Sequence, residues 1–328
     1  MTDAEPLVAV IVPMYNAAAT IDATIASICA QTHRSLDIVV VDDGSSDRSP
    51  QMVEAWMARD PRIRMVRQAN SGVATARNFG AANTTASYLA FIDADDVWAD
   101  NKIALQIAAL TAQSGPALVY CWFAQVDSDG RIFPVSEHPA YEGDVLRQLC
   151  RSNFVGNGSS MLMPREVFDR VGGFDPSLRE RGAQGCEDLM FLLGAAEFYP
   201  FLAVRNYLVG YRLTPKNMSS DTLRMLRSFD IVRQLYRARR PALIPELDAH
   251  RTDMMLWLVR RSLIAGKIWT AGRLFAGVLE SDRALALQTL PDLLMMFARA
   301  RLVPHAVKRA SARMLKRAPR PRYEELSW

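Results

Sequence analysis

The N-terminal part of the chain alternates short apolar runs with segments whose apolar residues recur every three or four positions. The apolar runs predict strands over residues 7–12, 36–41, 63–66, 88–92 and 118–123, and the periodic segments predict helices over residues 21–28, 52–57, 74–81 and 103–110. Most of these strands are continuously apolar, which is typical of strands buried on both faces in a parallel sheet. We therefore expect an α/β fold with a mostly parallel central sheet flanked by helices, and ligands at the carboxyl ends of the strands.

The middle of the chain is less regular. Residues 124–185 are rich in turn signals and contain a short predicted helix that Pro164 opens. A helix is predicted over residues 187–197. Strand-like pieces follow at residues 201–204 and 207–213.

Helical patterns dominate after Asp221, where the strand patterns end. An apolar block covers residues 252–264, and we expect Pro291 to open a further helix. Residues 301–317 carry an apolar stripe among many basic residues, as in a basic amphipathic helix. The fold is therefore expected to have a C-terminal helical extension.

The charge divides at the same place. The whole chain has 328 residues and a net charge of +4. Residues 1–220 hold 18 basic and 25 acidic residues, a net charge of −7, and residues 221–328 hold 21 and 10, a net charge of +11. We predict two domains with these bounds. The basic part is either a solvated helical addition or a surface for an anionic membrane, with residues 301–317 as the contact. Nucleic acid is not expected, because no known nucleic-acid module accompanies the charge.

Several classes of protein are excluded by missing patterns. The N-terminus MTDAEPLVAV has no basic residue before its apolar run, and no stretch of about 18 apolar residues occurs. We expect a cytoplasmic protein that touches a membrane only peripherally, at the inner face of the cytoplasmic membrane. The four cysteines form no CxxC pair, so structural zinc is not expected, and the poor secretory signal makes disulfides unexpected as well. The chain also lacks GxGxxG, GxxxxGK[ST] and GxSxG motifs.

Carboxylates gather where predicted elements end or begin. The groups are Asp42 with Asp43 after the second strand, Asp93 with Asp95 and Asp96 after the fourth strand, and Glu187 with Asp188 at a helix start. Asp93 and Asp95 could converge on a hard cation such as Mg²⁺ or Mn²⁺, which prefers oxygen ligands. A carboxylate of the third group could act as a general base. Each group also has a structural explanation, since acids are common in turns and in the first turn of a helix.

Taken together, these segments resemble the family 2 glycosyltransferases, which have a GT-A fold. The resemblance runs in order through VAVIVPMYN (8–16), IVVVDDGSSD (38–47), NSGVATARNFG (70–80), YLAFIDADD (88–96), VGGFD (171–175) and ED (187–188). It covers about two-thirds of the chain. It implies a Rossmann-like nucleotide-sugar-binding and catalytic domain.

The resemblance also implies roles for individual residues. The residues that match the family's nucleotide contacts are Pro13, Tyr15, Asn16, Asp42, Asp43 and Arg77. Asp95 matches the direct metal ligand of the DxD motif, and Asp93 lies close to the metal and the sugar or ribose. Asp188 of the Glu187–Asp188 pair matches the catalytic base. The implied reaction is a single displacement with inversion at the anomeric carbon, assisted by Mg²⁺ or Mn²⁺.

Two departures from the family pattern shape the expected function. The chain has no QxxRW segment, which implies transfer of one sugar at a time, and Thr214 stands where many relatives have a metal-binding His. We expect transfer from a nucleotide-diphosphate sugar, most often UDP-linked in the family, to a saccharide or lipid-linked saccharide acceptor in bacterial surface polysaccharide or glycolipid assembly. The alternative is a catalytically inactive nucleotide-sugar-binding partner or scaffold. Asn157–Ser160 is the segment we expect to select the acceptor.

Overall fold

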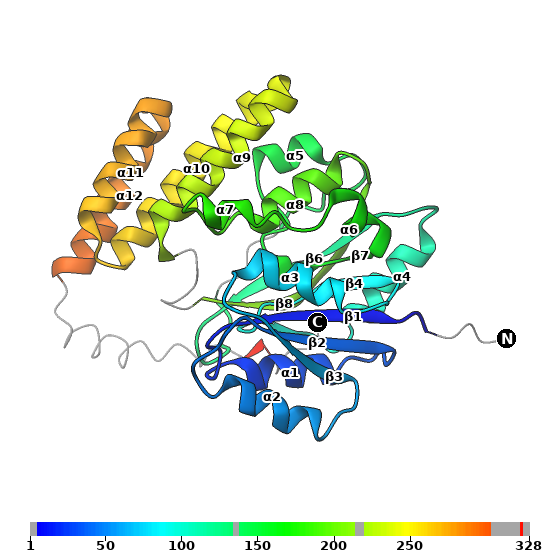
Figure 1. Cartoon of the computed structure of the whole chain (residues 1–328). Helices are drawn as coiled ribbons and strands as arrows, with labels where there is room; N and C mark the ends of the chain where they lie inside the picture. Colours follow the sequence, from blue (N-terminus) through cyan, green and yellow to red (C-terminus); the bar gives the residue numbers. More distant parts are fainter. Residues whose placement is uncertain (1–4, 134–137, 214–219, 303–321, 324–328) are drawn as a thin grey trace.

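A computed structural model describes residues 5–133, 138–213, 220–302 and 322–323 (Figure 1). Within these residues, eight strands form one sheet in the order β3-β2-β1-β4-β7-β6-β8-β5. Their bounds are β1 (Val8–Met14), β2 (Leu36–Asp42), β3 (Ile63–Arg67), β4 (Tyr88–Phe91), β5 (Val97–Trp98), β6 (Leu118–Val126), β7 (Met161–Pro164) and β8 (Phe201–Arg212).

Helices connect the strands and extend beyond them. Those of the α/β part are α1 (Ile21–Cys29), α2 (Ser49–Met57), α3 (Val73–Ala82), α4 (Lys102–Ala112), α5 (Leu146–Arg151), η1 (Gly158–Ser160), α6 (Arg165–Val171), α7 (Ser177–Glu180) and α8 (Glu187–Ala196). Those of the C-terminal part are α9 (Thr222–Arg239), η3 (Pro241–Leu243), α10 (Ile244–Ile264), α11 (Ile268–Ser281) and α12 (Arg283–Leu302).

The first four predicted strands form the parallel half of the sheet. β1 pairs in parallel with β2 and β4, and β2 pairs in parallel with β3. All residues of β1 except Pro13 are buried, as expected for a strand covered on both faces. The carboxyl ends of these strands therefore lie at one edge of the sheet, where acidic loops follow β2 and β4.

The other half of the sheet is mixed, and the sequence pattern only partly anticipates it. β7 lies antiparallel between β4 and β6, and the two-residue β5 pairs antiparallel with β8. Neither strand was predicted. The predicted pieces at 201–204 and 207–213 are one strand, β8, whose pairing with β6 shifts register around Trp122. The two predicted pieces therefore correspond to the regular stretches on either side of an irregularity.

A close approach brings α3 against the sheet. A Cβ added at Gly80 would lie 2.5 Å from Ile11 Cγ2, so the helix can pack here only because this residue has no side chain. Ile11 is fully buried in β1. The contact fixes the position of α3, which carries Arg77 toward the carboxyl edge.

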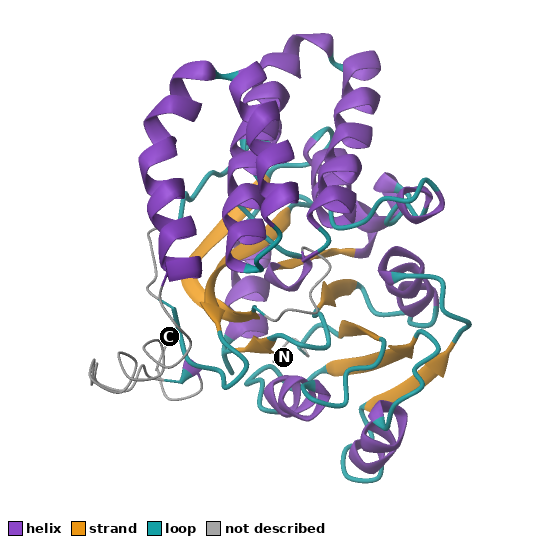
Figure 2. Cartoon of the chain, turned by 90° about the vertical axis from the view of Figure 1, so that its left-hand side faces the viewer, coloured by secondary structure: helices purple, strands orange, loops and turns teal. Residues whose placement is uncertain are grey.

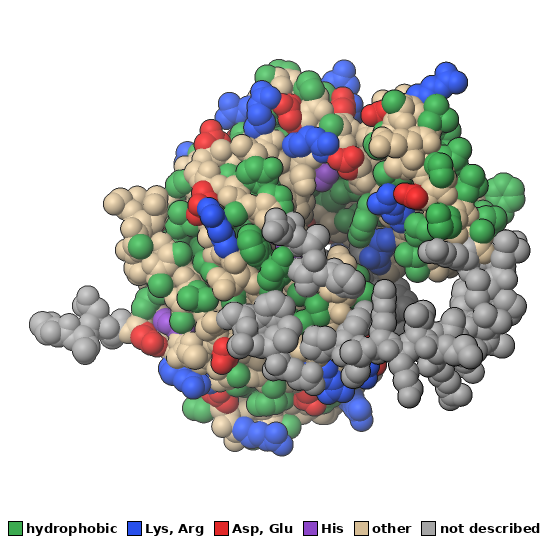
Figure 3. All heavy atoms as spheres, turned by 180° about the vertical axis from the view of Figure 1, so that it is seen from behind, with side chains coloured by type: hydrophobic (Ala, Val, Ile, Leu, Met, Phe, Trp, Pro, Cys, Tyr) green, Lys and Arg blue, Asp and Glu red, His purple; other side chains and the backbone are tan. Residues whose placement is uncertain are grey.

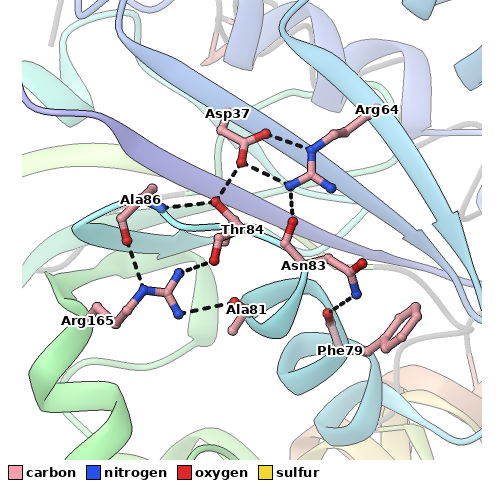
Figure 4. Close-up of polar contacts among 8 residues, drawn as sticks. All are labelled: Asp37, Arg64, Phe79, Ala81, Asn83, Thr84, Ala86 and Arg165. Carbon is pink, nitrogen blue, oxygen red and sulfur yellow. Dashed lines mark hydrogen bonds and ion pairs between the residues drawn. The ribbon is translucent and has the colours of Figure 1, made fainter.

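A polar network fixes the turn between α3 and β4 (Figure 4). Arg165 donates to three carbonyl oxygens of residues 81–86 at 2.9–3.1 Å. Asp37 in β2 accepts from Thr84 and, through both carboxylate oxygens, from Arg64 in β3. These bonds link β2, β3, α3 and α6, and so hold the strand that leads to Asp93.

The C-terminal helices stand over one end of the sheet (Figure 2). They share the core of the α/β part, since Phe229 and Val232 of α9 and Leu247 of α10 are fully buried in the same cluster as Leu189 of α8. The expected change to helix after Asp221 is confirmed.

Two expectations for the C-terminal part have different outcomes. The expectation that Pro291 opens a helix is wrong, because α12 begins at Arg283 and contains Pro291 in its interior. The predicted helix over residues 301–317 falls almost entirely outside the described residues. The domain boundary near residue 220 stays a prediction.

Exposed apolar side chains gather on the C-terminal helices, at the right of the view in Figure 3. They include Ile264, Trp269, Leu279, Leu287, Leu294 and Met295. None of the described helices combines the length and the apolar character that crossing a bilayer requires.

Candidate functional site

A cleft of about 1270 Å³ opens at the carboxyl edge of the parallel strands. Its walls come from the loops after β1, β2 and β4, from α3, from the turn before α8, and from α9 and α10. Nine of the ten predicted site residues line it: Pro13, Tyr15, Asn16, Asp43, Arg77, Asp93, Asp95, Glu187 and Asp188. Asp42 does not, and its predicted contact with the nucleotide is untested.

The loop after β1 is locked by Asn16. Its backbone has a φ of 51°, in the left-handed region that Asn tolerates better than most residues. The side-chain oxygen accepts from Ser46 N at 2.8 Å, and Asn16 N donates to Ser45 Oγ at 3.0 Å. The neighbouring Tyr15 is 55% exposed and lines the cleft. Asn16 therefore shapes the loop that presents Tyr15.

Asp42 and Asp43 lie in different surroundings although they are adjacent. Asp43 accepts from Gln68 Nε2 and Ser71 N at 2.7 Å, and from Gly72 N at 2.9 Å. Asp42 instead accepts from Ser45 N at 2.9 Å, away from the cleft lining. Asp43 thus organises the cleft loop before α3, and Asp42 caps the turn after β2.

The acidic loop after β4 is held by a buried serine. Ser159 Oγ donates to Asp96 Oδ2 at 2.6 Å and accepts from Asp93 N at 3.0 Å. The other oxygen of Asp96 accepts from Arg212 N at 3.0 Å. Asp96 is fully buried, so it supports the loop, while Asp93 and Asp95 line the cleft. Two members of the predicted selector segment, Ser159 and Ser160, are likewise fully buried.

The two cleft carboxylates suit a divalent cation. Burial raises the pKa of Asp95 to about 7, and the negative charge of Asp93 adds to the rise. A cation beside the pair would offset this repulsion, and Mg²⁺ is commonly bound through one or two carboxylates plus substrate phosphates. Among the described residues, no group of three or more His, Cys, Asp or Glu could hold a metal. Two carboxylates leave coordination positions for phosphate oxygens, so the pair fits a cation shared with a diphosphate. Thr214 lies outside the described residues.

Arg77 is almost fully buried and lines the floor of the cleft. Its Nη2 donates to Asp93 Oδ1 at 2.6 Å, and its guanidinium lies 5.0 Å from the ring centre of Phe174. Burial works against its charge, but Asp93, Asp188 and Glu187 outweigh that cost and raise its pKa. Arg77 is therefore ion-paired with the acidic loop after β4, and its charge interacts with the acids at the start of α8.

Two buried donors in this floor have no hydrogen-bond partner among the described residues. They are Arg77 Nε and Asn157 Nδ2, and both side chains line the cleft. A Cβ added at Gly158 would lie 2.8 Å from Arg77 Nη2, so the backbone comes as close to the guanidinium as a glycine permits. Both atoms are buried, and buried donors without partners are costly.

Asp188 has the properties of a general base. Burial raises the pKa of its carboxyl to about 7, and the charge of Arg77 opposes the rise. Its Oδ1 accepts from Leu189 N at 2.7 Å. Glu187 is buried with its Oε2 accepting from Gly185 N at 2.7 Å, so it shapes the turn before α8. A carboxyl with a pKa near neutrality is well suited to take and release a proton.

The cleft also contains residues that sequence reasoning missed. Arg179 of α7 donates to Asn70 at 2.6 Å beside the Asp43 loop. A further wall comes from the C-terminal helices, with Arg224, Met225, His250, Asp253, Met254 and Trp257. The last four lie at helical spacings of three, one and three, a periodicity that marks one face of α10. The helical spacing of these residues is present in the sequence, but no local pattern shows that this face lines the cleft.

Comparisons with known proteins agree with this arrangement. A model of the family described as glycosyl transferase family 2 matches residues 9–172, half of the chain. The uncharacterized glycosyltransferase EpsJ of Bacillus subtilis (strain 168) is 32% identical over 182 residues, which are 53% of this chain and 53% of that protein. The chain thus spans about half the length of the curated relatives it matches.

Solved structures share the fold. A fragment of S. aureus TarS in complex with UDP-GlcNAc superposes with a TM-score of 0.59 at 16% identity, over 93% of this chain and 92% of that one. The mannosyltransferase PcManGT from Pyrobaculum calidifontis, in complex with GDP-Man and Mn²⁺, superposes with a TM-score of 0.57 at 21% identity, over 92% and 83% of the two chains. The expected fold class, with its C-terminal helices, is confirmed.

Proposed function

The chain belongs to glycosyl transferase family 2, and we propose that it transfers one sugar from a nucleotide-diphosphate sugar to an acceptor hydroxyl with inversion. One observation carries the proposal. A single cleft joins Arg77, Asp93 and Asp95 to Asp188, a carboxyl whose pKa burial raises to about 7. In this proposal Arg77 faces the diphosphate, Asp93 and Asp95 hold the cation, and Asp188 is the base, all in one cleft.

In the proposed reaction Asp188 takes the proton of the acceptor hydroxyl. The acceptor oxygen forms a bond to the anomeric carbon from the face opposite the leaving group. The bond between the anomeric carbon and the diphosphate oxygen breaks, and its electron pair leaves with the nucleoside diphosphate. Because one displacement occurs, the anomeric configuration inverts. Arg77 lies between the two acidic groups, where its charge favours the ionised form of Asp188.

The donor is proposed to lie along the loops after β1, β2 and β4. Tyr15 presents an exposed ring for the base, and the loop that Asp43 organises lies beside it. Asp95, with Asp93, would hold Mg²⁺ or Mn²⁺, which neutralises charge on a departing diphosphate. The nucleotide is proposed to be UDP, the one in the TarS complex, although the PcManGT complex contains GDP-Man.

The acceptor is proposed to be a saccharide or lipid-linked saccharide in bacterial surface polysaccharide or glycolipid assembly. The net charge of +11 in residues 221–328 supports a peripheral contact with an anionic leaflet, at the inner face of the cytoplasmic membrane. Trp269 and Ile264 add exposed apolar surface to the same region. Salt-sensitive sedimentation with vesicles containing anionic lipid would support this location, and no sedimentation at low salt would contradict it.

The activity is tested by incubating the protein with UDP- and GDP-linked sugars and Mn²⁺ and measuring release of the nucleoside diphosphate. Slow hydrolysis is expected without an acceptor, and Asp95→Asn should lower it by at least about tenfold because the cation loses a charged ligand. Asp129→Asn, in an exposed turn outside the cleft lining, is the matched control and should have no effect. Saturable donor binding without turnover would favour the alternative, a binding partner or scaffold.

A further inference from the structure

One face of α10 forms part of the catalytic cleft. His250, Asp253, Met254 and Trp257 occupy that face and line the cleft. The opposite side of the helix, with Met255 and Val259, is buried against α11 in a separate apolar core. The helix therefore has two distinct faces, and the cleft-lining one borders the same cleft as Asp188.

This wall meets the turn that carries the base. A Cβ added at Gly185 would lie 3.4 Å from Met225 Cγ, and Cys186 Sγ donates to the carbonyl oxygen of Met225 at 3.9 Å. Gly185 and Cys186 belong to the turn that leads directly into Glu187 and Asp188. Figure 1 shows α9 and α10 close to α7 and α8, and away from α1 and α2 beside the first two strands. The wall thus lies on the α8 side of the cleft.

The exposed side chains of the wall have the chemistry of a carbohydrate site. Trp257 is 37% exposed, and the guanidinium of Arg261 lies 5.0 Å from its ring centre. Asp253 and Arg224 are exposed and line the same cleft. An aromatic surface with a few placed polar groups is typical of small-molecule sites. A pyranose offers the matching pattern, because its C–H face packs on an indole and its hydroxyls bond to a carboxylate and a guanidinium.

Buried contacts of His250 hold the same face against α5 and α9. Its Nδ1 lies 3.2 Å from the carbonyl oxygen of Cys150, and its ring packs edge to face on Phe229. Burial lowers the pKa of His250 to about 4, so the ring is neutral near pH 7. Arg151 forms an ion pair with Asp253 and thereby ties the wall to α5. These contacts give the wall a fixed position before any ligand arrives.

From this geometry we infer that Trp257, Asp253 and Arg224 form the acceptor subsite, which takes a saccharide with its ring on Trp257 and one hydroxyl toward Asp188. The inference rests on the proposed function, because it supplies the acceptor for that reaction. It assigns acceptor recognition to the basic C-terminal helices rather than to Asn157–Ser160.

The test separates donor hydrolysis from transfer. Wild type, Trp257→Ala, Trp257→Phe and Trp269→Ala are assayed for nucleoside diphosphate release, with and without a panel of p-nitrophenyl glycosides as acceptors. Trp269 is the matched control, because it is 91% exposed on α11 and does not line the cleft. Thermal unfolding of each variant shows whether it is folded.

We expect at least one glycoside to accelerate release by the wild type. Trp257→Ala should raise the KM for that glycoside by about tenfold or more and leave donor hydrolysis and the KM for the donor unchanged. Trp257→Phe should recover most of the loss, since it keeps an aromatic face, and Trp269→Ala should have no effect.

Three results would overturn the subsite. One is that no glycoside accelerates release although the donor is hydrolysed; another is that folded Trp257→Ala retains the wild-type KM for the acceptor. The third is an equal loss of hydrolysis and transfer in Trp257→Ala. Absence of any donor hydrolysis in the wild type is a different result, because it contradicts the proposed function and the subsite with it.

Discussion

The pH dependence of transfer follows directly from the surroundings of Asp188. Burial raises the pKa of its carboxyl to about 7, against the opposing charge of Arg77. A general base works in its ionised form, so the rate should rise with pH and then level off. With a pKa of about 7, about one-tenth of the molecules hold the carboxylate at pH 6 and about nine-tenths at pH 8. The rate at pH 6 should therefore be about a tenth of the plateau.

Replacing either acid of the pair tests which one is the base. Asp188→Asn removes the proton acceptor, so kcat should fall by about 10²- to 10⁴-fold and the remaining rate should lose its dependence on pH. Glu187→Gln keeps an oxygen that can accept from Gly185 N and removes a negative charge that raises the pKa of Asp188. It should keep kcat within about tenfold of wild type and move the midpoint of the profile to lower pH.

The assay is transfer or donor hydrolysis at saturating donor and Mn²⁺, from about pH 5.5 to 8.5, with unfolding measured at each pH. Saturating cation keeps Asp95 ionised, so its titration does not enter the profile. A flat profile in the wild type would refute the assignment of a base with a pKa near 7. A large loss in Glu187→Gln with near-normal Asp188→Asn would assign the base to Glu187.

The remaining predictions concern stability. Ser159→Ala removes a buried hydroxyl that bonds to Asp96 and to the backbone, so the free energy of unfolding should fall by about 2–4 kcal/mol in a urea titration, and an unchanged midpoint would contradict that role. Gly80→Ala places a Cβ 2.5 Å from Ile11 and should lower stability by about 1–3 kcal/mol through overpacking. Gly272→Ala, in α11 with open space around the Cα, should raise stability by about 0.5–1 kcal/mol, and equal effects of the two substitutions would refute the packing argument.

Local patterns explain why much of the site could be predicted. β1, β2 and β4 are buried aliphatic runs, and a parallel sheet brings their carboxyl ends to one edge whatever the rest of the chain does. The acids that follow them, Asp43, Asp93 and Asp95, therefore had to lie near one another. The resemblance to a known family then assigned their roles, and the cleft contains all three.

Other parts depend on contacts that no local pattern specifies. β5 has only two residues, Val97 and Trp98, and exists because β8 lies beside it. Asp42 and Asp43 are adjacent, and consecutive side chains of a strand point to opposite faces. Which of the two lines the cleft depends on the exact end of β2 and on the turn after it. Pro291 lies inside α12 although proline favours the first turn, so this residue by itself did not mark the helix start.

Residues on both sides of the charge division at residue 220 line the cleft. Phe229 and Val232 of α9 are buried in the same core as residues of α8, the helix that begins with Glu187 and Asp188. α10 supplies Trp257 to the cleft wall on its cleft-lining face. Because the helices that carry the proposed base and the proposed acceptor subsite pack together, a shift of the C-terminal helices would move the acceptor relative to Asp188, and a displacement of about 1 Å can cost about 10²-fold in rate. We therefore expect the basic helices to affect the geometry of the proposed reaction, whatever surface their charges also contact.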